Sequence, residues 1–427
     1  MTCDMICFLF TSLMSIKYRP ASHFELGQLT SNVNTQLCIE LTDSRYVSEY
    51  IEKIQNLMIG LHLSFDGDNL IPHKDTLDIV KLPQVENVQD ACEWFAPKMV
   101  PYSERIGLIA ANDRFIVLNT NHIVGDGGTF VKLIKDIQNP SLHNLILNGQ
   151  YTRPIFPIPV EDEFSEQIQN LDLNFHKLNN LAPLTQSFSK LEKNDPTKWA
   201  KSIFFRTNVN KFKCWDSNLK KCHKMTDYLW TSLLLSMNAF NGKLGPIGCS
   251  TCVDLRDISK NGKNCDAHTN IYSVIIARAP VSRGMTIGEL GNYIRSDFMN
   301  RKLHHEPLFI LHHGGEILHY DDNRPGSYAD LSQLAPFEIK DPIKDVWASV
   351  HVKDGPLSFL SLLGQAVVNN ETNLNVFGGR LQYRESKFVE KDAIKIMKSI
   401  DYFLQNVELD RFVGDVFDEL KNFQNSL

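Results

Sequence analysis

A chain of 427 residues is long enough for two packed domains, and 43% hydrophobic with 22% charged residues is ordinary for a globular protein. The net charge of −6 and the pI near 6.2 exclude nucleic-acid binding through a large basic excess, so we expect no nucleic-acid partner. Nine scattered cysteines lack the pattern of a small disulfide scaffold, which favours a reducing compartment.

The N-terminal stretch Met5–Met14 is apolar but lacks the positive segment that begins a signal peptide. It is also too short to span a bilayer, and no other segment approaches that length. We therefore expect a soluble, cytoplasmic body. Two interpretations of the stretch stay open: it dips into a membrane surface, or it is not a genuine start of the protein.

The first half of the chain alternates short helices and strands. Apolar residues at helical spacing predict three helices: Tyr46–Met58, Val88–Phe95 and Thr129–Ile137. Short apolar runs bounded by turn residues predict three strands: Leu61–Phe65, Arg105–Ala110 and Arg114–Asn121. A hairpin turn at Asp66–Asp68 follows the first strand. The last strand leads directly into His122.

A proline-rich connection follows, with Pro154, Pro157 and Pro159 in a short stretch. Proline fixes φ and removes a hydrogen-bond donor, so this segment predicts a connection rather than a core element. We place the boundary between the halves in this region, between about 150 and 200, and divide the chain at residue 175 into two lobes.

The second half repeats the mixture of helices and strands. Thr226 is the predicted N-cap of a helix that runs through Ala239. The other predicted helices are Thr286–Leu303, Glu316–His319, Ala393–Gln405 and Asp410–Phe423. The predicted strands are Ser202–Phe205, Gly248–Leu255, Asn270–Ala277, Trp347–Val352, Ser358–Leu363 and Leu374–Phe377.

The segment from His122 to Gly128, His-Ile-Val-Gly-Asp-Gly-Gly, is the strongest candidate for chemistry. A histidine at a strand end, followed by Asp126 and two glycines, holds an imidazole in a fixed pose because glycine permits a close backbone approach. Such an imidazole can accept a proton from an alcohol or an amine. The alternative is a surface histidine beside an Asp-Gly turn.

Metal-binding patterns are weak in this sequence. The spacing of Cys249, Cys252, Cys265 and His268 fits a tetrahedral zinc site. The first two cysteines lie on a predicted strand and point to opposite faces, so we expect no metal. The pairs His304–His305 and His312–His313 are expected at solvated helix ends, where adjacent side chains diverge.

The order of the pieces resembles a known superfamily. That order is a strand, the HxxxDG motif, a helix, the strand-end sequence Val253-Asp-Leu-Arg256 and Asn270. It resembles the order found in coenzyme-A-dependent acyltransferases, which include the condensation domains of peptide synthetases. The closest resemblance is to fungal alcohol acetyltransferases. Tyr328–Ala335 is similar to that family's Ser-Asn-Leu-Gly strand, with substitutions at Gln333 and Ala335. Leu374–Gly379 keeps only Phe-Gly of the Asp-Phe-Gly-Trp-Gly loop found in plant relatives.

The resemblance implies an α/β (α+β) fold of two chloramphenicol-acetyltransferase-like lobes, 1–175 and 176–427, in a V with a central tunnel. It implies that His122 is the general base in that tunnel. Asp126 either forms a catalytic dyad with His122 or a structural ion pair with Arg256, and the ion pair is favoured. Gly127 is assigned to the turn. Gly128 and Asn270 are candidate oxyanion or tunnel contacts.

The activity implied is transfer of an acyl group, acetyl in the first instance, from acyl-CoA to an alcohol. Acyl-CoA is then a co-substrate, with no bound cofactor, in a monomer attached peripherally to endoplasmic reticulum or lipid droplets. Asn121 replaces the first histidine of the double-histidine version of the motif, which favours a free acyl-CoA donor. Alternatives are N-acylation of an amine such as a long-chain base, an inactive binding homologue, and a condensation unit with a carrier-bound donor.

Overall fold

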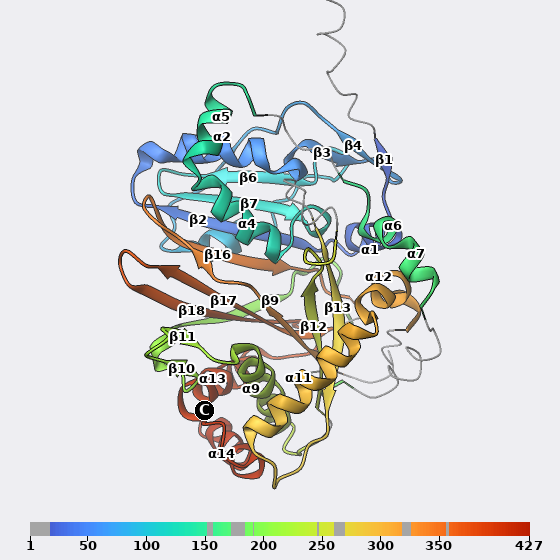
Figure 1. Cartoon of the computed structure of the whole chain (residues 1–427), viewed down its shortest axis with the longest axis vertical. Coiled ribbons are helices and arrows are strands. Elements are labelled where there is room, and N and C mark those ends of the chain that lie inside the picture. The colour runs from blue at the N-terminus through green and yellow to red at the C-terminus, as the bar shows by residue number, and fades with distance from the viewer. Residues whose placement is uncertain are drawn as a thin grey trace, which may run out of the picture.

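The computed structural model describes residues 18–151, 157–171, 184–190, 192–245, 247–259, 270–317, 326–355 and 358–427. Two large sheets, each covered by helices, form two lobes that meet along a seam (Figure 1). The apolar stretch Met5–Met14 lies outside these residues. Among the described helices, none combines the length and the apolar character needed to cross a membrane.

The first lobe is built on a five-stranded sheet. Its strand order is β16 (Ile343–His351), β2 (Asn34–Leu41), β7 (Phe115–Asn121), β6 (Gly107–Ala111) and β5 (Val80–Lys81). Helices α2 (Val47–Leu57) and α4 (Gly127–Ile137) pack on one face, where Leu37 is buried. Helix α3 (Val88–Phe95) packs on the other face, where Cys38 is buried. Successive residues of β2 thus point to opposite faces of the sheet and are buried in two separate cores. Every residue of the strand is therefore buried.

One strand of this sheet comes from the other half of the chain. β16 pairs antiparallel with β2, with Trp347 opposite Cys38 (Figure 1). The next strand along the chain, β17 (Phe359–Asn369), belongs to the second sheet. The division of the chain at residue 175 stays a prediction. The strand β16, which lies after that residue in the chain, belongs to the sheet of the first lobe.

The second lobe is built on an eight-stranded sheet. Its main path is β13 (Tyr272–Ala279), β12 (Ile247–Asp254), β14 (Ser327–Gln333), β17, β18 (Leu374–Tyr383) and β9 (Lys201–Asn208). The short strands β8 (Gln186–Ser187) and β15 (Phe337–Glu338) pair with β14 and β17. β14 runs parallel to both neighbours in the path, whereas the other pairings on the path are antiparallel.

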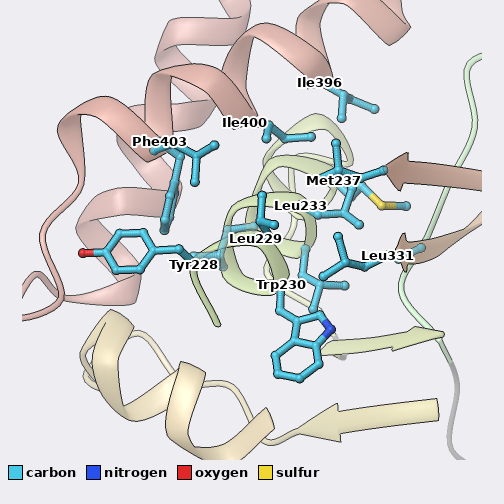
Figure 2. Packing of buried hydrophobic residues seen from close by; sticks show 14 of the residues in the cluster. Tyr228, Leu229, Trp230, Leu233, Met237, Leu331, Ile396, Ile400 and Phe403 are labelled. Carbon is cyan, nitrogen blue, oxygen red and sulfur yellow. The ribbon is translucent and has the colours of Figure 1, made fainter. Parts of the chain in front are cut away.

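Helix α9 (Met225–Phe240) forms the centre of the second lobe's core. It lies between the sheet and the helices α11 (Ile287–Leu303), α13 (Glu390–Asn406) and α14 (Val413–Asn425). Figure 2 shows Leu233 and Met237 of α9 beside Ile400 of α13. Trp230 of α9 is fully buried, and its indole nitrogen donates to the hydroxyl of Thr251 at 2.8 Å. Truncation of such a side chain typically costs about 3–5 kcal/mol.

The remaining elements are short or lie at the edges of the lobes. They are β1 (Arg19–Pro20), α1 (His23–Thr30), β3 (Leu63–Phe65), β4 (Asn69–Pro72), the 3₁₀ turn η3 (His122–Val124), α5 (Pro140–Leu147), α6 (Val160–Glu163), α7 (Ser165–Gln169), β10 (Trp215–Asp216), β11 (Lys221–Cys222) and α12 (Glu306–Ile317), with further 3₁₀ turns at Ser44–Tyr46, Ile59–His62 and Val209–Lys211.

The predicted cap of α9 is wrong. The helix begins at Met225, and its N-cap is Lys224, which has a left-handed φ of 50° and makes no side-chain cap bond. The hydroxyl of Thr226 instead donates to Gln333 of β14 at 2.6 Å. A tertiary partner therefore replaces the local cap. The predicted start at Thr286 is confirmed, because Thr286 and Glu289 form a reciprocal capping box.

The predicted strand Leu374–Phe377 is confirmed, and β18 continues through the two glycines that follow it. A Cβ on Gly378 would lie 2.4 Å from the Trp347 ring, so this glycine lets the two sheets approach each other. The predicted helix at Glu316–His319 overlaps only the end of α12, and residues 318–325 lie outside the described part of the chain.

Candidate active site

His122 stands at the point where β7 ends and η3 begins. Its backbone N–H donates to the carbonyl of Val33 at 2.8 Å. The side chain of Asn121 caps the 3₁₀ turn by accepting from the N–H of Ile123 at 3.1 Å. These two bonds hold the backbone on both sides of the histidine, so the imidazole is attached to a backbone whose position is fixed.

A cavity of 1230 Å³ lies against this histidine and extends between the two lobes. The first lobe contributes Thr35, His122 and Gly128 to its lining, and the second contributes Cys252 and Tyr272. A volume of this size is larger than a typical pocket for one small ligand, about 300–1,000 Å³. It is therefore large enough to hold two reactants side by side.

The imidazole of His122 is oriented by an aromatic neighbour. Its ring stacks on Tyr272 with centroids 4.7 Å apart and an interplanar angle of 26°. The residue is 9% exposed. Nδ1 is buried and has no hydrogen-bond partner, which leaves Nε2 as the nitrogen able to face the cavity.

Burial lowers the pKa of His122 below the ordinary histidine value. The negative charge of Asp126 acts in the opposite direction without outweighing burial. The neutral imidazole therefore predominates at neutral pH. A neutral ring nitrogen can accept a proton, as a general base must.

Asp126 is the N-cap of α4, and its hydrogen bonds go to groups other than His122. Its carboxylate accepts three hydrogen bonds: from the Thr129 N–H at 2.7 Å, from Arg256 at 2.8 Å and from the Ile271 N–H at 2.7 Å. Burial alone would raise the pKa of this carboxyl, but Arg256 and the amide donors together hold it below its usual value. This geometry is that of the ion pair favoured from the sequence rather than a dyad.

Arg256 forms hydrogen bonds to residues of both lobes beside the histidine loop. Nη2 donates to Asp126 and, at 2.9 Å, to the hydroxyl of Thr129. Nη1 donates at 3.0 Å to Asp254, at the end of β12. The guanidinium thus connects the first turn of α4 with the second lobe. Breaking a buried pair of this kind typically costs about 3–5 kcal/mol because one charge is left unpaired.

The two glycines after Asp126 give space to side chains from the second lobe. A Cβ on Gly127 would lie 2.0 Å from Leu334, and a Cβ on Gly128 would lie 2.2 Å from Nη1 of Arg256. Both residues belong to the first turn of α4, not to a separate turn before it. Glycine at 128 therefore allows the guanidinium to reach Asp126.

The structure brings most of the predicted site residues together. His122, Asp126, Gly127, Gly128 and Arg256 all line the cavity. Asn270 is not among the described residues that line it. Asn270 directly precedes Ile271 in the chain, and its buried amide oxygen has no hydrogen-bond partner.

Sequence reasoning missed three residues that line the cavity from the second lobe: Cys252, Tyr272 and Ser332. The hydroxyl of Ser332 donates to the Cys252 sulfur at 3.0 Å. Burial raises the pKa of that thiol to about 12, so it is protonated and a poor nucleophile. No local pattern singles these residues out, because alternation assigns each to one face of its strand but does not say which strands border the cavity.

The other predicted polar clusters separate in space. Cys249 lies in the core beneath the sheet, whereas Cys252 faces the cavity, as expected for strand residues three apart. Cys265 and His268 lie outside the described residues. Within the described ranges, no three His, Cys, Asp or Glu side chains are placed to share a metal ion.

The two histidine pairs are partly as predicted. His304 caps the end of α11, and both it and His305 are exposed. The prediction for the second pair is wrong in its position, because His312 lies inside α12 rather than at its end, although it is exposed. The run of apolar residues before it continues the helix through this point.

The fold is shared with solved structures. The chain matches the condensation domain of the Monacolin K polyketide synthase (TM-score 0.62, 11% identity, 93% of this chain and 99% of that one). It matches the X-domain from teicoplanin biosynthesis (0.60, 13%, 91% and 95%). It also matches a trichothecene 15-O-acetyltransferase from Fusarium sporotrichioides (0.58, 12%, 91% and 95%).

No protein-family model matches the sequence, and no curated protein matches it. At these low identities the structural matches establish the fold alone. The predicted two-lobed α/β fold of the condensation-domain and acyltransferase type is confirmed.

Proposed function

We propose that the protein is an acyltransferase that moves an acyl group, acetyl in the first instance, from acyl-CoA to an alcohol, with His122 as general base. One observation carries the proposal. A buried imidazole with a lowered pKa lines a cavity between two lobes, and the Asp126–Arg256 pair fixes its loop across the junction. The proposal includes free acyl-CoA as co-substrate and no resident cofactor.

The reaction needs one base and no covalent enzyme intermediate. Nε2 of His122 accepts the hydroxyl proton while the acceptor oxygen attacks the thioester carbonyl. The tetrahedral adduct collapses with cleavage of the carbon–sulfur bond, and the departing thiolate takes the proton back from the imidazolium. The ester and free CoA are the products. A well-placed base of this kind contributes about 10²–10⁴-fold to the rate.

Alignment of the two reactants supplies a further part of the rate gain. The cavity extends from Lys135 on α4 to Ser332 on β14, so donor and acceptor can approach His122 from different lobes. Asp126 and Arg256 act on the histidine by positioning its loop. All three hydrogen bonds that Asp126 accepts come from protein groups, so none of them is available to the substrate.

Of the two candidate oxyanion contacts, we favour Gly128. It lines the cavity with His122, and its amide lies in the first turn of α4, where N–H groups lack intrahelical partners. A single donor of this type is worth about 2.7–4 kcal/mol in the transition state. Asn270 does not line the cavity and is the weaker candidate.

Membership of the fungal alcohol acetyltransferase family is part of this proposal. The Val253–Arg256 sequence and the HxxxDG motif support it, as does the shared fold with a trichothecene O-acetyltransferase. Peripheral attachment to a membrane and a monomeric state are further parts of the proposal, which rest on the resemblance alone.

The test measures CoA release from acetyl-CoA in the presence of a panel of alcohols and amines. We expect release that requires an acceptor and that falls about 100-fold or more in His122→Ala. His304→Ala replaces an exposed histidine outside the cavity and should leave the rate unchanged. Circular dichroism checks that both variants fold.

Equal background release from the wild type and His122→Ala, across the panel and with longer acyl donors, would overturn the proposal. The inactive binding homologue would then be the best remaining interpretation. An ester or an amide among the products, identified by mass spectrometry, decides between O- and N-acylation.

A further inference from the structure

Tyr272 places its ring on the imidazole of His122. The two ring centroids lie 4.7 Å apart and the ring planes differ by 26°. Offset-stacked aromatic pairs have separations of this kind. Both residues line the cavity, although they come from different lobes: His122 follows β7, and Tyr272 begins β13. The phenol ring is thus a group of the second lobe that touches the proposed base.

Three contacts hold Tyr272 in this position. Its hydroxyl accepts from Nε2 of Gln28 at 3.3 Å, and its ring meets Phe24 edge to face with centroids 5.7 Å apart. Both partners belong to α1 of the first lobe. On the backbone side, the N–H of Ile271 donates to Asp126 at 2.7 Å. The carboxylate of the histidine motif therefore fixes the residue next to Tyr272 instead of bonding to the imidazole.

The imidazolium that forms when His122 accepts a proton has no carboxylate partner among the described residues. Nδ1 is buried and no side chain bonds to it, whereas Asp126 accepts from two backbone amides and Arg256. In a catalytic dyad, a carboxylate on that nitrogen stabilises the charged ring. Burial disfavours the charged ring further and lowers the pKa of His122, and Asp126 and the residue's own carbonyl only partly oppose this effect. The site therefore needs another group that stabilises the charge.

The face of the Tyr272 ring can supply this stabilisation. An aromatic face carries partial negative charge, and a cation within about 6 Å of the ring centre is attracted to it. The His122 ring lies inside that limit. Because the neutral imidazole has no net charge, the attraction strengthens when the proton is transferred, which is the condition for an effect on rate. Burial raises the pKa of the Tyr272 phenol well above its ordinary value, so its hydroxyl stays protonated and the attraction comes from the ring.

We propose that Tyr272 is a positioning residue for the reaction: its ring fixes the plane of the His122 imidazole and stabilises the positive charge that the imidazole carries after it accepts the acceptor's proton. This inference rests on the proposed acyltransferase function and adds to it a residue of the second lobe that acts through the base of the first. The base is therefore fully supported only where the two lobes meet.

The other ionisable groups that act on Tyr272 are Asp126, Cys252 and Asp330. Asp126 is paired with Arg256. Burial raises the pKa of the Cys252 thiol to about 12, so it is neutral. Burial also raises the pKa of Asp330, which is bonded by two serine hydroxyls. None of these groups bonds to the imidazole, so a change in the titration of His122 after a change of the ring reports on the ring.

The first test is an NMR titration of His122 in protein labelled with carbon-13 in the histidine rings, without substrate. His122→Ala identifies the signal. Tyr272→Leu keeps an apolar side chain at this place and removes the aromatic face, so His122 should titrate at lower pH than in the wild type. Tyr272→Phe keeps the face and should titrate as the wild type does. If the ring only excluded water, its loss would move the titration up toward about 6.5.

Fluorinated phenylalanine in place of Tyr272 keeps the shape of the ring, so it tests the charge without disturbing the fold. Each fluorine withdraws negative charge from the ring face, and His122 should titrate at progressively lower pH as fluorines are added. The matched control is Tyr402→Leu. Tyr402 on α13 stacks on Phe423 with centroids 4.5 Å apart and planes 24° apart, outside the cavity. This variant should leave the titration of His122 unchanged.

CoA release from acetyl-CoA with a saturating acceptor measures the effect on rate. It should fall about 10–30-fold in Tyr272→Leu and less than about 3-fold in Tyr272→Phe, as expected for loss of a desolvated cation–π contact. A titration of His122 that stays the same or moves up in Tyr272→Leu, or that ignores fluorination, would overturn the inference.

CoA release by the wild type in those circumstances would leave the acyltransferase function standing. A titration that moves down as expected, without CoA release from any acceptor by the wild type, would support the contact between the rings and overturn the function.

Discussion

At the scale of single residues, His122 shows how burial and charge compete. Removal of water disfavours the imidazolium, and the nearest carboxylate, Asp126, is already committed to Arg256 and two backbone amides. A histidine whose aspartate pointed at it would be more basic. The arrangement keeps His122 in its proton-accepting form over a wider range of pH.

The first prediction concerns pH. Because the pKa of His122 is lowered, the acid limb of kcat/KM should lie below the ordinary histidine value of about 6.5. Activity should be full at neutral pH and fall as the pH drops through the lowered pKa. The measurement is a pH profile of CoA release with a neutral alcohol. An acid limb centred above pH 7 would contradict the role given to burial.

The second prediction concerns the ion pair. Arg256→Ala should lower the free energy of unfolding by about 3–5 kcal/mol, because the Asp126 charge is left buried. Asp126→Asn with Arg256→Ala should cost less than the sum of the two single changes. Urea unfolding of the four proteins in this cycle measures the coupling. If Asp126 were instead a dyad partner, Asp126→Asn would reduce kcat sharply with little loss of stability.

Much of the residue-level site could be predicted. His122, Asp126 and Arg256 belong to short motifs whose spacing is visible in the sequence, and the structure joins the last two as expected. Tyr272 and Ser332 could not be found in this way. Their closeness to the cavity depends on which strands are neighbours and in what register, and no local pattern specifies that.

At the scale of elements, α4 connects the histidine loop to the second lobe. Asp126 caps it, and its first turn carries the two glycines against which Leu334 and Arg256 pack. Helix and strand positions were predictable here because apolar periodicity is strong. The cap of α9 was not, because the hydroxyl of Thr226 is bound by Gln333, more than a hundred residues away in sequence.

The third prediction tests the tight approach at α4. Gly128→Ala places a Cβ 2.2 Å from Nη1 of Arg256 and 2.8 Å from Asp254, so the guanidinium must move. We expect a loss of about 1–3 kcal/mol in unfolding free energy, together with reduced CoA release. The control is Gly27→Ala in α1, where a Cβ meets nothing within 4 Å. Equal behaviour of the two variants would show that Arg256 does not need this space.

At the scale of the whole molecule, the two sheets are joined where β16 runs beside β17. The side chain of Gln365 on β17 is buried and bonds both backbone groups of Ala348 on β16, each at 2.8 Å. Gln382 of β18 adds a bond to the Val350 carbonyl at 2.8 Å. Strand order was not predictable, because β16 and β17 are alike in pattern yet enter different sheets.

The fourth prediction concerns this seam. Gln365→Leu keeps the volume but leaves the N–H and C=O of Ala348 without partners in a buried position. The expected loss in unfolding free energy is about 2–6 kcal/mol, since each of the two orphaned groups costs about 1–3 kcal/mol. Urea unfolding is the measurement. Gln405→Leu on α13, which breaks only a bond to Asp401 one turn away, should cost far less.

The placement of β16 also has a consequence for how the chain is made. Ribosomes deliver the segment up to α4 long before residues 343–351, so the growing first lobe exposes the edge of β2 through most of synthesis. That edge carries unpaired backbone groups until the last fifth of the protein emerges. Nascent chains stalled before β16 should therefore bind chaperones or aggregate, and those stalled after it should resist proteolysis.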